Sequence, residues 1–122
     1  MNIEKITQNG KTVAVITSED KVMTDVQSAL DLIMTAKYEV GTNMIAIDKN
    51  AVAEDFFILS RGLAGEILEK FITYKAKIAI YGDYSKYTSK PLKDFIYESN
   101  RGNDVFFVAT EDEAVSYLIL AK

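Results

Sequence analysis

Apolar residues recur along the chain with two different periods, and each period predicts one kind of element. Residues 3–8 and 12–17 are short segments rich in β-branched side chains, which are typical of strands. Asn9 and Gly10 lie between them and are the pair preferred in tight two-residue turns. We therefore expect a β-hairpin at the start of the chain.

A helix is predicted after the hairpin, because apolar residues then recur every three or four positions. Ser18, Thr24 or Asp25 could cap its start, and Gly41 could end it. The residues on its apolar face are Val22, Met23, Val26, Ala29, Leu30, Ile33 and Met34.

Three short runs farther along the chain predict buried strands. Residues 44–48, 77–81 and 105–109 are nearly all apolar, as expected for strands that are covered on both faces in a parallel sheet. The stretch from residue 49 to residue 62 fits neither period, and we expect it to be irregular.

Three further helices are predicted between and after these strands. One runs from Leu63 to Phe71, one follows Pro91, and one is led by Thr110 and Glu113 in a capping-box arrangement. The element order is β-β-α-β-α-β-α-β-α. Because parallel strands need crossover connections, we expect an α/β fold with a mixed, mostly parallel five-stranded sheet and four helices. The hairpin should add an antiparallel strand at or near one edge.

The composition limits both the size of the protein and its chemistry. With 122 residues, 48% hydrophobic and 26% charged, the chain should form a single domain over residues 1–122. It contains no cysteine and no histidine, which removes thiol chemistry, the commonest general acid–base group and the commonest transition-metal ligand. We therefore expect a protein that is not an enzyme and needs no cofactor or metal.

The charge pattern bears on partners and location. The formal net charge is −4 and the basic residues form no block, which argues against nucleic-acid binding. No apolar run approaches the roughly 20 residues that cross a bilayer, and the start of the chain lacks the apolar core of a signal peptide. We expect a cytoplasmic protein that does not bind membranes.

Polar residues gather where the predicted parallel strands end, which is the edge at which open sheets of this kind bind ligands. Asp48 ends one strand, and Asp83, Tyr84 and Lys86 lie in the loop after the next strand. Asp48 with Asp83, or with Glu66, could bind a divalent cation or act in acid–base chemistry. We consider this the weakest interpretation, because two of 18 acidic residues are expected at strand ends by chance.

Two serines, each followed by a basic residue, lie near predicted helix starts. Ser60 with Arg61 and Ser89 with Lys90 could hold an anion against free backbone N–H groups. The simpler interpretation, which we favour, makes both serines N-caps and Asp83 a turn residue.

Two adjacent phenylalanines lie within the irregular stretch. Phe56 and Phe57 could form an exposed apolar patch for a partner, together with Tyr84 and Tyr87. We favour burial of at least one of the two rings as a plug in the core.

Four stretches of the chain resemble the bacterial domain-of-unknown-function family 4180. They are GLAGEILEKF at residues 62–71, IAIYGDYSKY at 78–87, DFIYESNRG at 94–102 and VFFV at 105–108. The resemblance spans nearly the whole chain. It implies a short bacterial protein, and it implies no established biochemical role.

The element order is also similar to that of the STAS fold, found in anti-sigma-factor antagonists and in the tails of sulfate transporters. In that fold an Asp-Ser-Ser/Thr-Gly-Leu motif leads the second helix, and its second hydroxyl residue is phosphorylated. Here Ser60, Gly62 and Leu63 match, but Leu59 occupies the aspartate position and Arg61 the phosphoacceptor position. The phosphorylation switch is therefore not expected in this chain.

Three hypotheses of function follow. The first is a non-enzymatic regulatory or protein-interaction module, STAS-like in fold, whose working surface is formed by residues 49–62 and 82–90. The second is a protein that binds a small anionic ligand or a nucleotide at the same edge, around Arg61 and Asp83. The third is a metal-dependent enzyme. A homodimer, formed through an exposed hairpin edge, is a further expectation.

Overall fold

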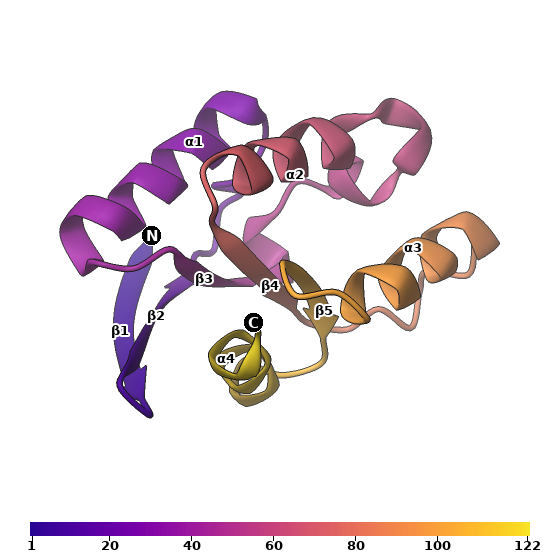
Figure 1. Ribbon diagram of the computed structural model, residues 1–122. Coiled ribbons are helices and arrows are strands. Elements are labelled where there is room, and N and C mark those ends of the chain that lie inside the picture. Colours follow the sequence, from indigo (N-terminus) through magenta and orange to yellow (C-terminus); the bar gives the residue numbers. More distant parts are fainter.

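The computed structural model describes all residues from Met1 to Lys122 and contains one five-stranded sheet with helices on both faces (Figure 1). Its strands are β1 (Asn2–Gln8), β2 (Lys11–Thr17), β3 (Met44–Asp48), β4 (Lys77–Tyr81) and β5 (Val105–Val108). Its α-helices are α1 (Val26–Thr35), α2 (Leu63–Thr73), α3 (Lys90–Asn100) and α4 (Glu111–Leu120). The predicted fold class and element order are confirmed.

The strands lie side by side in the order in which they occur in the chain. β1 pairs with β2 in an antiparallel manner, and every other pair is parallel. Asn9 and Gly10 form the hairpin turn with φ angles of 52° and 75°, the positive values that this pair tolerates best. The antiparallel strand therefore lies at one edge of the sheet, as predicted.

The order of the strands decides which face each helix covers. From β2 to β5, each new strand is added on the same side of the strand before it. Because crossovers between parallel strands are right-handed, α1, α2 and α3 then lie on one face of the sheet. The isoleucines Ile45, Ile47, Ile78 and Ile80 form the core of that face. α4 has no strand after it and covers the opposite face, where its buried residues join Val15 and Ala79 (Figure 1). None of the helices is long and apolar enough to cross a membrane.

The first helix begins later than its apolar spacing predicts, so the assignment of Val22 and Met23 to that helix is wrong. Met23 is fully buried and pairs with Val52 in an isolated parallel bridge. α1 begins at Val26 because Asp25 caps it. The Asp25 carboxylate accepts the N–H of Ser28 at 2.7 Å, and the Ser28 hydroxyl accepts the N–H of Asp25 at 3.0 Å. One π-helical turn, Ala36–Val40, then extends the helix to Gly41, which ends it as predicted.

The irregular stretch consists of three 3₁₀ turns, η2 (Lys49–Ala51), η3 (Glu54–Phe57) and η4 (Leu59–Arg61). Ser60 lies within η4 and caps nothing, so its predicted role as an N-cap is wrong. Gly62 takes the cap position of α2 instead, because the chain turns there with a φ of 78°. The predicted caps Ser89 and Thr110 are confirmed, since each side chain accepts a backbone N–H of the first helical turn.

The free edge of β5 is covered by a side chain. The Asn100 amide donates to the Phe107 carbonyl at 2.9 Å, and its oxygen accepts the Phe107 N–H at 2.7 Å. Asn100 thus gives Phe107 the two backbone bonds that a neighbouring strand would give. Because Asn100 covers the edge of β5, only β1 is left as a long, exposed edge strand.

Candidate functional site

The ends of β2 to β5 meet at one edge of the sheet, which we call the carboxyl edge. The turns η2, η3 and η4 follow β3 at this edge, and the loop of residues 82–89 follows β4. Although the two segments lie far apart in the sequence, contacts between their side chains join them. The carboxyl edge is therefore the part of the fold where the predicted site residues can be tested.

A buried lysine lies at the centre of this edge. Lys49 follows β3 directly, is 7% exposed and is the only charged residue in the chain that is buried. Its Nζ lies 4.7 Å from the ring centre of Tyr87, 5.1 Å from that of Phe57 and 6.0 Å from that of Tyr84. We call these three rings the Lys49 cage. Each close cation–π contact contributes about 0.5–2 kcal/mol, and desolvation lowers the pKa of Lys49 below its ordinary value.

The position of the lysine stem depends on Gly82. A Cβ atom at residue 82 would lie 2.7 Å from the Cβ of Lys49 and 3.2 Å from its Cδ. Carbon atoms pack best at about 3.5–4.0 Å, so any other residue at position 82 would displace the lysine. The end of β4 and the end of β3 therefore fit together only with glycine at this point.

Glu54 joins the two segments through charge. Its carboxylate lies 3.7 Å from Lys49 Nζ, accepts from Lys86 Nζ at 3.1 Å and accepts from the Tyr87 hydroxyl at 2.9 Å. Desolvation alone would raise the pKa of Glu54, but the bonds from Tyr87 and Lys86 and the nearby Lys49 lower it overall. Glu54 is thus held as a carboxylate that links η3 to the loop after β4.

Aromatic packing completes the contact between the segments. The Tyr84 hydroxyl donates to the Ile80 carbonyl at 2.7 Å, and its ring packs edge-on to Phe57 at 5.9 Å. Phe57 also stacks on Tyr87 at 5.2 Å. Burial raises the pKa of Tyr84 and of Tyr87, so both stay protonated near neutral pH. Phe56 and Phe57 are both buried, which confirms the plug interpretation and contradicts the prediction of an exposed aromatic patch containing Phe57.

The predicted acidic residues have local partners and lie in separate pockets. Asp48 accepts the N–H of Asn50 at 2.8 Å, and Asp83 accepts the N–H of Ser85 at 2.8 Å, the pattern of turn residues. The two bonds from Ser85 lower the pKa of Asp83. Asp83 borders an open pocket of about 580 Å³ between β5, α3 and α4, whose lining includes Glu113 and no basic residue. No group of three or more acidic side chains in the structure could hold a metal ion.

The predicted basic residues are exposed and already paired. Arg61 lies 3.8 Å from Asp55, Lys86 binds Glu54 as described, and Lys90 binds Asp94 at 2.6 Å. Arg61 lines neither the Asp83 pocket nor the pocket that contains Asp48. The structure therefore brings Phe57, Tyr84 and Lys86 together, and it leaves Ser60, Arg61, Ser89 and Lys90 in their own local settings.

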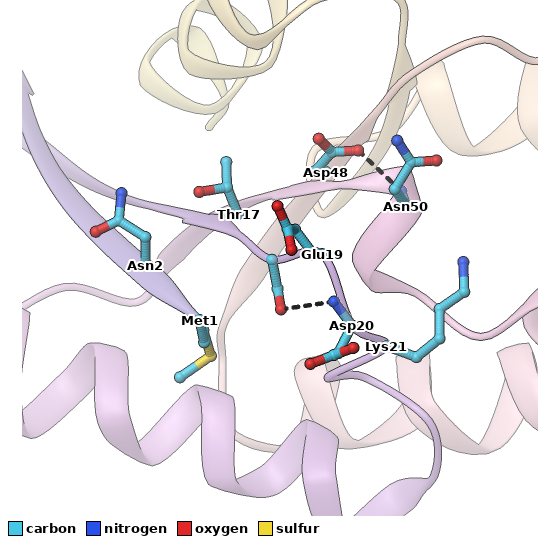
Figure 2. Close-up of a pocket in the computed structure, with 9 residues that line it drawn as sticks. Met1, Asn2, Thr17, Glu19, Asp20, Lys21, Asp48 and Asn50 are labelled. Atoms are coloured by element: carbon cyan, nitrogen blue, oxygen red, sulfur yellow. Dashed lines mark hydrogen bonds between the residues drawn. The ribbon is translucent and has the colours of Figure 1, made fainter.

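A second open pocket, of about 920 Å³, lies where β2 and β3 end, beside the first residues of β1 (Figure 2). The predicted site residue Asp48 borders it. Glu19, Asp20 and Lys21 also border it, and these three were not predicted as site residues. Figure 2 shows the Asp48 bond to the Asn50 backbone. The Asp20 N–H donates to the Ser18 hydroxyl at 3.1 Å. The acidic lining disfavours an anionic ligand here.

Lys49 and Glu54 are the site residues that sequence reasoning missed. A lysine directly after a buried strand, and a glycine directly after the next strand, were the available signals for Lys49. Glu54 carries no such signal, because nothing in the chain distinguishes it from Asp55 before the 3₁₀ turns are known.

The comparisons with known proteins bear on the family and the fold. The model of one family, described as Domain of unknown function (DUF4180), matches residues 8–118. Among curated proteins there is no significant match. A solved structure of a proposed anti-sigma factor antagonist from Thermotoga maritima is similar, with 13% identity and a TM-score of 0.45, covering 96% of this chain and 94% of the other.

Proposed function

The chain belongs to this family of unknown function, and we propose that it is a non-enzymatic regulatory module that binds a protein partner at its carboxyl edge. One observation carries the proposal. The Lys49 cage and Glu54 join residues 49–61 to residues 82–89 through direct side-chain contacts, so that two segments far apart in the sequence form one continuous surface. A surface that is already ordered binds a partner without the entropic cost of fixing loops.

The exposed residues of this surface suit a protein partner. Ile58 is 43% exposed, although it lies between the buried phenylalanines and η4. Asp55 and Arg61 pair on either side of it in the chain, and the Lys86 side chain is 61% exposed. An apolar residue with charged residues of both signs around it is typical of a small interaction surface.

The alternative of a small anionic ligand at this edge has less support. Arg61 and Lys86 are each engaged by a carboxylate of the same surface. The pocket beside Asp83 adds further acidic charge and no cation. An anion would have to displace these internal pairs, whereas a protein partner with both charge signs would extend them.

Affinity capture from cells that contain the native partners tests the proposal. We expect the wild-type protein to retain a specific partner, and Ile58→Glu and Arg61→Glu to lose it. Leu120→Glu is the control, because Leu120 is also an exposed apolar residue, 76% exposed, and lies on α4 away from the carboxyl edge. Retention by Ile58→Glu and Arg61→Glu, with loss by Leu120→Glu, would contradict the proposed surface.

A further inference from the structure

The opposite edge of the sheet, where β2, β3 and β4 begin, has the reverse charge; we call it the amino edge. An open pocket of about 700 Å³ lies there, and its lining contains no acidic residue. The lysines among its 13 lining residues are Lys11, Lys37, Lys75, Lys77 and Lys122. The chain as a whole has 18 acidic residues against 14 basic ones, so this concentration of positive charge is local.

Two of these lysines have structural roles. Lys11 Nζ donates to the Ile119 carbonyl at 2.9 Å, near the end of α4. Lys77 Nζ donates to the Asn103 carbonyl at 2.7 Å and pairs with Asp104 at 3.1 Å. Lys37, Lys75 and Lys122 form no ion pair within the chain. Lys37 Nζ lies 5.5 Å from the ring centre of Tyr38. None of the three ammonium groups is neutralised by a carboxylate, so all three can bind an anion.

Helix ends explain part of this charge. Lys37 lies in the last turn that extends α1, and Lys75 follows α2, where cations interact favourably with the partial negative charge of a helix end. That effect does not require a lysine at position 75 itself, because Lys70 already occupies the last turn of α2.

The backbone at Lys75 provides an independent observation. Lys75 has a φ of 55°, in the left-handed region where glycine or asparagine is preferred after a helix. The Asn43 amide donates to its carbonyl at 2.7 Å and holds the turn in this form. A lysine therefore occupies a position where glycine would be more stable, and such a cost at a pocket indicates a function for the side chain.

We propose that the amino-edge pocket binds a small ligand with several phosphate groups, held by Lys37, Lys75 and Lys122. Ammonium groups form strong charge-assisted hydrogen bonds with phosphate oxygens. Tyr74 also lines the pocket and is about half exposed, so its ring is available to a nucleobase. A nucleoside triphosphate fits both features, and inorganic triphosphate fits the lysines alone. This site is separate from the carboxyl edge and does not depend on the function proposed there.

Isothermal titration with ATP and with inorganic triphosphate tests the site, using the full chain. We expect saturable binding of both, weakened roughly tenfold by Lys75→Gly, which corresponds to about 1.4 kcal/mol. Without ligand, Lys75→Gly should have a higher Tm than the wild type, because glycine relieves the left-handed backbone. A higher Tm shows that the variant is folded, so its weaker binding would come from loss of the Lys75 ammonium group and not from unfolding. Weaker binding of inorganic triphosphate than of ATP would assign the difference to Tyr74, and equal binding would assign recognition to the phosphates.

Lys93→Ala is the matched control, since Lys93 is an exposed lysine on α3 that forms no ion pair and does not line the pocket. We expect it to bind like the wild type. Equal weakening by Lys93→Ala and Lys75→Gly would show general electrostatic attraction and overturn the proposal. Absence of heat with both ligands at millimolar concentration would also overturn it.

Discussion

Replacing Gly82 with alanine would place a methyl group where the Lys49 side chain already lies. The new Cβ would be 2.7 Å from the Cβ of Lys49, so one of the two must move by about 1 Å to reach an ordinary contact. Lys49 Cβ is attached to the backbone of η2 and cannot rotate away. We expect the overpacking to cost roughly 1–3 kcal/mol, and the shift to pull Nζ away from the Tyr87 ring.

Thermal and urea unfolding measure this cost. For a domain of this length, 1 kcal/mol corresponds to about 3–5 °C, so Gly82→Ala should lower Tm by roughly 3–15 °C. Gly65→Ala is the control, because Gly65 lies in α2 and a Cβ there meets nothing within 4 Å. That change should instead stabilise the protein by about 0.5–1 kcal/mol. A Gly82→Ala variant as stable as Gly65→Ala would refute the packing of Lys49 against residue 82.

Two further predictions concern Asn100 and Glu54. Asn100→Ala leaves the Phe107 N–H and carbonyl without partners, so it should cost about 1–3 kcal/mol of stability and promote aggregation through β5. An unfolding midpoint and light scattering equal to those of the wild type would contradict the edge-covering role. The lowered pKa of Glu54 means that its contribution to stability is present above its ordinary value of 4.5 and is lost as the pH falls through the lower folded-state pKa. Below about pH 5 the Tm of Glu54→Gln should therefore fall less steeply than that of the wild type. Because Glu54 is half exposed, the difference should correspond to less than about 1 kcal/mol of stability. Identical profiles of Tm against pH for the two proteins would argue against the ion pairs of Glu54.

The sequence predicted the fold well because its signals were local. The buried runs at 44–48 and 77–81 are too apolar for any exposed strand, and Asn9-Gly10 specifies its own turn. The order of the strands was not predictable, since any order with right-handed crossovers fits the same pattern. Met23 was misassigned because its apolar spacing suits a helix equally well, and only its tertiary pairing with Val52 decides otherwise.

The site was harder to predict because its parts come from distant segments. Asp83 and Ser89 were correctly interpreted as a turn residue and a cap, since their partners lie two or three residues away. Asp48 was considered only as a possible metal or acid–base group, and its bond to the Asn50 N–H makes it a local cap instead. Ser60 looked like a cap, but the 3₁₀ turns carry it past the helix start and leave that position to Gly62. Lys49 and Glu54 each contact residues more than 30 positions away. Only the position of Lys49 after a buried strand gave a local signal, and Glu54 gave none.

Hydrogen exchange of the Glu54→Ala variant measures whether residues 49–61 and 82–89 act as one surface. If Glu54, Lys49 and Tyr87 lock the two segments together, the variant should exchange faster in both of them, while the amides of α4 should keep their wild-type rates. Faster exchange in residues 54–57 alone, with unchanged rates in residues 82–89, would contradict the account.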